Sequence, residues 1–198
     1  VTVPAGHVAF VITGHADGGT PELTAAETAH HGNLLDAGHQ VTFLRLGRLA
    51  ASDLSAAALV TGVEYPSLDA GTAEQLLADG GRVLLIHTAG AVLGGDWSWR
   101  TNDPDYWDLV VESSTDYLAS YGVGAELTVQ SDELAHRVTA DYPTGWTVLG
   151  RNSQSAESRT AFSRTVGTGR GALYTYNPGW FTTAGEGVFT EILGWLTE

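Results

Sequence analysis

The stretch HVAFVIT at residues 7–13 decides the fold of this chain. It is apolar on both faces, which is typical of a central strand in a parallel sheet covered on both sides. A glycine-rich turn comes next at residues 14–19, and a helical pattern runs from Thr20, the expected N-cap, to about Ala37. Gly38 then ends the helix. Residues 7–38 therefore predict a strand, a turn and a helix.

The same alternation repeats over the first ninety residues. Strands are predicted at residues 40–46, 56–61 and 82–86, and a short helix is predicted between the last two. Asp69 is its expected N-cap, and Gly80-Gly81 its end. Such βαβ units predict an α/β fold: a flavodoxin-like, doubly wound and mostly parallel sheet with helices on both faces.

The second half of the chain is less regular. A helix is expected from Asp103-Pro104 through Val110, and residues 126–130 alternate like a strand. Residues 159–166 and 171–176 flank a glycine-containing turn and predict a β-hairpin near the sheet edge. An apolar stripe from Phe189 to Leu196 predicts a final helix that packs on the sheet. We expect one domain over residues 1–198, closed by this C-terminal hairpin and helix.

Composition excludes several classes of protein. The chain has 198 residues, 43% of them apolar, and a formal net charge of −14 that repels phosphate backbones, so nucleic acid is not an expected partner. Its nine basic residues are all arginine, and it has no cysteine, hence no disulfide and no thiolate metal site. No apolar run is long enough to span a bilayer. Since the sequence begins Val-Thr-Val-Pro, we expect an exported, extracellular product whose leader was removed, with a cytoplasmic location as the alternative.

A resemblance to a known superfamily is carried by residues 80–90, GGRVLLIHTAG. This stretch looks like the nucleophile-elbow region of the class I glutamine amidotransferase-like superfamily, in which a strand enters a sharp turn. His87 stands at the position of that superfamily's cysteine, and Asn177 and Gly179 stand at the positions of its histidine and glutamate. Because a thioester needs a thiol nucleophile and a base to activate it, the chain is not expected to hydrolyse glutamine.

Within that superfamily the sequence resembles the trehalose-utilisation (ThuA-like) family. His87 follows a Gly-Gly strand as in that family, and residues 135–139 (AHRVT) are similar to its His-Pro-φ-Thr segment, with Arg137 in place of proline. Residues 167–176 are similar to its Gly-x-Gly-Arg turn and aromatic strand. An Asp-Glu-x-Tyr element of the family has no counterpart in residues 146–158. The resemblance implies a role in sugar metabolism, and on it alone His136 becomes a candidate site residue.

Ligands of open α/β sheets bind beyond the carboxyl ends of the strands. That rule gathers the turns after the first, third, fourth and last parallel strands. Imidazole and carboxylate groups there can act as acid and base, or hold a divalent metal ion if they converge. The predicted catalytic residues are His87, His15 and Asp17. The predicted substrate-binding residues are Glu64, Tyr65, Thr88, Trp97, Trp99, Asn177 and Trp180. No cofactor and no metal ion is predicted.

Aromatic residues cluster just after the elbow, at Trp97, Trp99, Tyr106 and Trp107. Flat rings beside polar groups suit the stacking of sugar rings, but tryptophans also anchor protein interfaces and fill cores. Two hypotheses therefore stand. The first is a ThuA-like protein that binds or processes a carbohydrate. The alternative is a catalytically inactive domain that serves as an oligomerisation module, a homo-oligomer or a subunit of an extracellular assembly.

Overall fold

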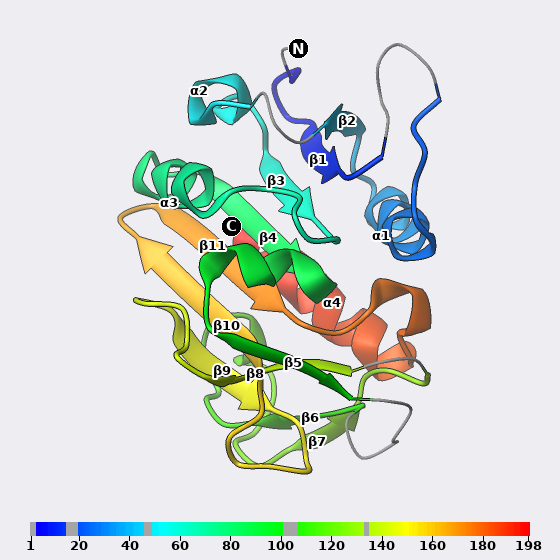
Figure 1. Cartoon of the computed structure of the whole chain (residues 1–198), viewed down its shortest axis with the longest axis vertical. Coiled ribbons are helices and arrows are strands. Elements are labelled where there is room, and N and C mark those ends of the chain that lie inside the picture. Colours follow the sequence, from blue (N-terminus) through cyan, green and yellow to red (C-terminus); the bar gives the residue numbers. More distant parts are fainter. Residues whose placement is uncertain (1–2, 15–19, 46–48, 101–106, 133–134) are drawn as a thin grey trace.

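The computed structural model describes residues 3–14, 20–45, 49–100, 107–132 and 135–198, and in them the chain is a mixed α/β protein (Figure 1). The predicted α/β class is confirmed. One sheet of eleven strands runs through the described residues, and its main path is β2-β1-β3-β4-β11-β10-β9-β6-β7. Among those residues no helix has the length and apolar character needed to cross a membrane.

Five neighbouring strands of the sheet are parallel. They are β2 (Val41–Arg45), β1 (Val8–Ile12), β3 (Leu59–Gly62), β4 (Arg82–Ile86) and β11 (Gly169–Tyr174). Every residue of β1 and β3 is buried, as expected for parallel strands that are covered on both faces. The four strands predicted in the first ninety residues are all present, with ends that shift by up to three residues.

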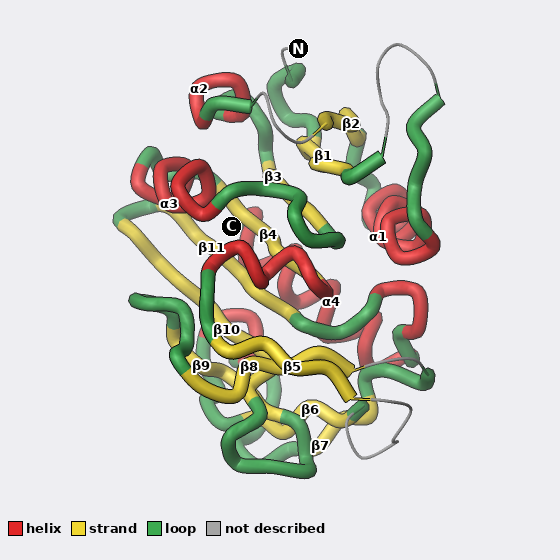
Figure 2. The backbone as a smooth tube through the Cα atoms, viewed as in Figure 1, coloured by secondary structure: helices red, strands yellow, loops and turns green. Residues whose placement is uncertain are grey.

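The rest of the sheet is antiparallel. Its strands are β10 (Arg159–Val166), β9 (Thr147–Arg151), β6 (Asp108–Val111) and β7 (Glu126–Thr128), with β8 (Ala135–Ala140) and β5 (Asp96–Arg100) branching from β10. In Figure 2 strands β5 to β9 lie at the lower end of the molecule, away from α2 and α3. The sheet is thus mixed, and the predicted mostly parallel pattern describes only the part from β2 to β11.

The helices lie on both faces of the parallel part. One face packs against α1 (Ala25–Asp36) and α4 (Thr183–Thr197), and the other against α2 (Ala51–Leu54) and α3 (Ala70–Ala78). Side chains of each strand alternate between the two cores, so that Phe10 and Ile12 face α1 and α4 while Ala9 and Val11 face α3. The described residues also form the short 3-10 helices η1 (His87–Leu93), η3 (Asp116–Leu118) and η4 (Pro178–Trp180).

The predicted C-terminal hairpin and helix are present, but the hairpin is not at the sheet edge. Strand β11 pairs in parallel with β4 on one side and antiparallel with β10 on the other, so it is a central strand. The nearly continuous burial of β11 is the physical sign of that place. The hairpin therefore joins the parallel and antiparallel halves of the sheet.

One predicted helix is present with a later start, and one helix prediction was wrong. Helix α1 begins at Ala25 and not after Thr20, because Thr24 and Glu27 form a reciprocal capping box. The helix predicted from Asp103 through Val110 is replaced, over its described part, by strand β6, whose alternating burial fits a period of two. Helix α2 and strands β5, β8 and β9 were not predicted.

Candidate functional site

His87 lies where strand β4 ends and the 3-10 helix η1 begins. Its φ of 54° is in the left-handed region, which non-glycine residues seldom adopt. The flanking strands β3 and β11 both run parallel to β4, so His87 sits at the carboxyl edge of the central strands. The sharp turn expected from the sequence is therefore present at this residue.

Glu64 follows β3 at the same edge, and threonine hydroxyls hold both of its carboxylate oxygens. Thr24 donates to Oε1 at 3.2 Å, and Thr88 donates to Oε2 at 3.0 Å. Each hydroxyl oxygen also accepts a backbone N–H, from Glu27 and from Tyr65 respectively. Each hydroxyl has one O–H proton to donate. The Thr24 hydroxyl lies within hydrogen-bonding distance of Glu64, and the Thr88 hydroxyl lies closer to Glu64 than to its other acceptor, the Val63 carbonyl at 3.4 Å. The carboxylate is therefore fixed as an acceptor.

A second carboxylate, Glu27, holds Thr24 in the position from which Thr24 donates to Glu64. Glu27 is fully buried. Its Oε1 accepts the backbone N–H and hydroxyl of Thr13, and its Oε2 accepts the backbone N–H of Thr24. It thereby ties the end of β1 to the start of α1 and holds Thr24 in place for Glu64. Sequence reasoning missed Glu27, although the capping-box spacing of Thr24 and Glu27 was the signal that could have found it.

Two histidines complete the group. The His87 Nδ1 atom lies 3.8 Å from the Glu64 Oε2 atom, and the rings of His87 and His136 meet edge to face with centroids 4.4 Å apart. Burial lowers the pKa of His87 to about 4. The pKa of His136 is lowered to about 3 by burial and, secondarily, by His87, against a raising effect of Glu64. Both rings are therefore neutral at pH 7.

Asn177 and the aromatic Trp180 lie after the carboxyl end of β11. The backbone N–H of Asn177 donates to the Gln130 side chain, and its own Oδ1 accepts the N–H of Gly179. Asn177 thus caps the helix η4, which packs against α1. Trp180 at the end of η4 is 40% exposed, and Tyr65, beside Glu64, is 59% exposed.

The three tryptophans after the elbow have different surroundings. Trp97 packs against Gly90 and the core beneath α3, and its indole N–H donates to the carbonyl of Gly94. Trp99 pairs through its backbone with His136, in the antiparallel register of β5 and β8, while its side chain lies outside the described residues. Trp107 is half-buried.

Of the predicted catalytic residues, His15 and Asp17 lie outside the described residues, as does Tyr106. The structure therefore brings together Glu64, Thr88, His87 and His136. Within the described ranges no group of three or more histidine, aspartate or glutamate side chains is arranged to hold a metal ion.

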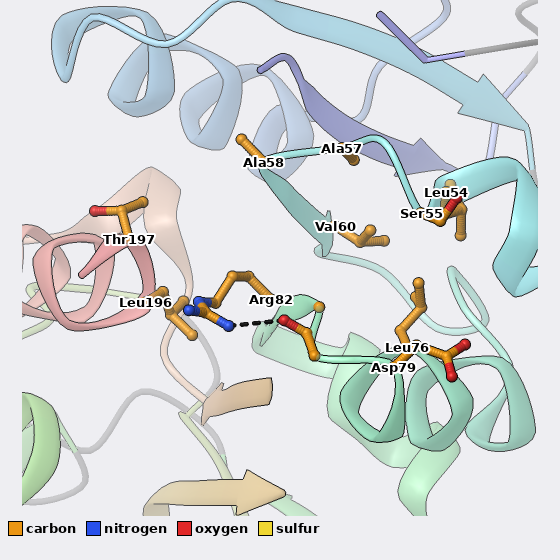
Figure 3. Close-up of a pocket in the computed structure, with 12 residues that line it drawn as sticks. Leu54, Ser55, Ala57, Ala58, Val60, Leu76, Asp79, Arg82, Leu196 and Thr197 are labelled. Atoms are coloured by element: carbon orange, nitrogen blue, oxygen red, sulfur yellow. Dashed lines mark hydrogen bonds between the residues drawn. The ribbon is translucent and has the colours of Figure 1, made fainter. Parts of the chain in front are cut away.

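A cavity of about 350 Å³ lies at the opposite edge of the sheet, beside the amino ends of β3 and β4 (Figure 3). Arg82 lines it, but its guanidinium donates to the backbone carbonyls of Gly80 and Thr168. Arg82 therefore ties two turns together, a structural role that is separate from the group around His87.

Comparisons with known proteins give no family for this chain. No protein-family model matches the sequence, and no curated protein matches it. Among solved structures, the exo-beta-1,4-mannosidase Op5Man5 from Opitutaceae bacterium strain TAV5 is similar, with a TM-score of 0.49 and 14% sequence identity. The likeness covers 94% of this chain and 32% of the mannosidase, so the chain spans about a third of that protein's length. At this level the likeness carries no conclusion about function.

Proposed function

We propose that this chain is a ThuA-like domain that binds a carbohydrate at the carboxyl edge of its parallel strands, around Glu64 and His87. The observation that carries the proposal is the carboxylate of Glu64, fixed by two threonine hydroxyls and 24% exposed, beside two neutral histidines. A carboxylate accepts hydrogen bonds, and a neutral imidazole has one donor nitrogen and one acceptor nitrogen. Sugar hydroxyls can both donate and accept, so they can pair with these groups.

The electrostatics favour a neutral ligand. Glu64 is held as an acceptor, and His87 is not protonated at pH 7, so these two side chains offer no positive charge to an anionic ligand. The formal net charge of −14 repels anions further. A polyol meets these conditions, whereas a sugar phosphate does not. Glutamine hydrolysis lies outside the proposal, since the sequence contains no cysteine.

Exposed aromatic residues support the choice of a sugar among polyols. Tyr65 is 59% exposed, immediately after Glu64, and its backbone N–H is held by Thr88. An exposed tyrosine ring whose backbone is held by a hydrogen bond can present an apolar face to a ligand, and it loses little side-chain conformational entropy on binding. We assign Tyr65 as the stacking residue, in preference to Trp97, which packs into the protein's own core.

The proposal extends to the fold type. The five parallel strands follow the order β2-β1-β3-β4-β11, and helices lie on both faces. This order corresponds to the doubly wound, flavodoxin-like pattern. It supports assignment of the parallel part to that type, with the antiparallel strands as an addition after β4.

The second candidate function, an inactive module for oligomerisation or an extracellular assembly, is favoured by the place of Trp97. Its half-buried indole packs against the core beneath α3. In addition, a groove of about 580 Å³ lies between α1 and α4, where polar residues such as Asp36 and Glu186 lie beside the buried Phe189. A self-associating protein would use such a surface and would not need Glu64 to be exposed.

A sugar-binding assay with matched variants separates the two functions. Glucose, mannose, galactose, trehalose and mannobiose are titrated into the protein by isothermal calorimetry, while light scattering measures its mass. We expect one of these sugars to bind, Glu64→Gln to weaken binding at least about tenfold through loss of a charge-assisted hydrogen bond, and Tyr65→Ala to weaken it as well. Glu126→Gln, an exposed site on β7, is the control that leaves binding unchanged. Absence of binding by the whole panel, together with a stable oligomer, would favour the assembly function.

A further inference from the structure

The Nδ1 atom of His87 is buried and forms no hydrogen bond within the described part of the chain. A buried polar atom without a partner is costly, so it requires a physical explanation. The His87 side chain is 10% exposed, and that remaining exposure is not at Nδ1. Of the two ring nitrogens of His87, only Nδ1 is a buried atom without a hydrogen-bond partner.

The polar atom that faces Nδ1 is a carboxylate oxygen. Glu64 Oε2 lies 3.8 Å from Nδ1, which is beyond hydrogen-bonding distance. At this separation water screens the electrostatic interaction between the two atoms only weakly. The Glu64 carboxylate cannot turn away easily, since Thr24 and Thr88 hold its two oxygens. A neutral imidazole can place either a proton or a lone pair on Nδ1. A lone pair there would face an anion, whereas an N–H would be attracted by it.

We propose that Glu64 is a positioning residue that holds His87 as the Nδ1–H tautomer and so reserves Nε2 as a hydrogen-bond acceptor for the ligand. The tautomer of a histidine is set by the partner of its other nitrogen. The ligand contact rests on the proposed function: a sugar hydroxyl donates to Nε2 of His87.

The 3.8 Å separation between Nδ1 and Glu64 has an explanation in the same terms. A hydroxyl that donates to Nε2 makes the Nδ1–H a stronger donor, because hydrogen bonds in a chain polarise one another. The bound state is then expected to bring Nδ1 within hydrogen-bonding distance of Glu64. A carboxylate, an imidazole and a ligand hydroxyl would form one chain in which each group is oriented by the one behind it.

NMR of the imidazole nitrogens in the ligand-free, ¹⁵N-labelled protein tests the tautomer directly. Long-range ¹H–¹⁵N spectra at pH 7 distinguish a protonated from an unprotonated ring nitrogen, and His87→Gln identifies the resonances. We expect the Nδ1–H form to exceed the Nε2–H form about tenfold, within the range that hydrogen bonds to charged groups reach. Glu64→Gln is expected to abolish that excess, while Glu126→Gln keeps it.

Each outcome decides the role of Glu64. A wild-type His87 that is mainly in the Nε2–H form, or an excess of Nδ1–H that survives Glu64→Gln, would overturn it. If Glu64→Gln does not fold, the wild-type tautomer alone decides. The spectra need no sugar, so a failed sugar titration with an Nδ1–H ring would count against the proposed function and leave the role of Glu64 intact.

Discussion

Lowering the pH from 7 to 5 is expected to destabilise this protein strongly, because three of its histidines are buried as neutral rings. His30 is fully buried between the rings of Phe10 and Phe189, and its Nε2 is 2.9 Å from the hydroxyl oxygen of Thr61. Burial and, secondarily, His31 lower the pKa of His30 to about 3. The others are His87 and His136, whose pKa values are lowered to about 4 and about 3.

The sign and size of the effect come from proton linkage. Below a pH of about 6.5 the unfolded chain binds protons at these histidines while the folded protein does not, so stability falls as the pH falls from about 6.5 toward the folded pKa values. Between pH 7 and pH 5 each histidine is expected to cost about 2 kcal/mol, and the three together about 6 kcal/mol. Since domains are stable by about 5–15 kcal/mol, the protein is expected to approach unfolding near pH 5.

Urea denaturation followed by circular dichroism at pH 7 and pH 5 measures this loss. His30→Gln keeps a polar group for Thr61 and removes the titration, so its loss between the two pH values is expected to be smaller than that of the wild type by about 2 kcal/mol. His39→Gln is the control, since that ring is only half-buried. Equal losses in the wild type and in His30→Gln would refute the assignment of His30 as a buried neutral histidine.

Four further predictions concern the packing and the chemistry. Gly90→Ala is expected to lower the free energy of unfolding, measured in urea, by about 1–3 kcal/mol, because a Cβ there would overlap Leu173 Cδ1 and lie 2.8 Å from Trp97 Cη2. Gly32→Ala is expected to raise the free energy of unfolding by about 0.5–1 kcal/mol, because Gly32 is helical and a Cβ there would meet nothing within 4 Å. Glu27→Gln is expected to lose about 1–3 kcal/mol, since its amide cannot accept on both sides, and an unchanged midpoint would contradict its role. The purified protein is expected to release no ammonia from glutamine, and heat-labile release that follows the protein through purification would contradict this.

The parallel part of the fold was predictable because its sequence signals are local. Residues 83–86 form an apolar run that follows Gly80-Gly81-Arg82, and strand β4 has the predicted bounds, residues 82–86. Asp69 is the N-cap of α3, as expected. In both cases the signal lies in neighbouring residues, which is why the sequence could locate the strand and the cap.

The antiparallel part was not predictable, because it depends on distant partners. Strand β6 was expected to be helical, yet its backbone pairs with β7 and β9. The central place of β11 likewise depends on pairing with β4, nearly ninety residues away in the sequence. Sequence patterns report burial and local propensity but not which strand becomes the neighbour.

In the candidate site, too, the sequence identified residues that carry a local signal and missed those that depend on distant contacts. His87, Glu64 and Thr88 were found by the rule that ligands bind at the carboxyl ends of strands. Glu27 was missed because its role, acceptance of hydrogen bonds from Thr13 and Thr24, appears only when β1 and α1 are placed together. The approach of His136 to His87 depends on the pairing of β8 with β5 and β10, which no local pattern encodes.

Titration of sugars against the ring resonances of His87 tests carbohydrate binding at this edge of the sheet most directly. We expect a sugar from the panel to shift the unprotonated Nε2 resonance of His87 in a saturable manner, and Glu64→Gln to raise the sugar concentration at half-saturation at least about tenfold. Shifts confined to residues of the groove between α1 and α4, or no shift at His87 at saturating sugar, would contradict sugar binding at Glu64 and His87.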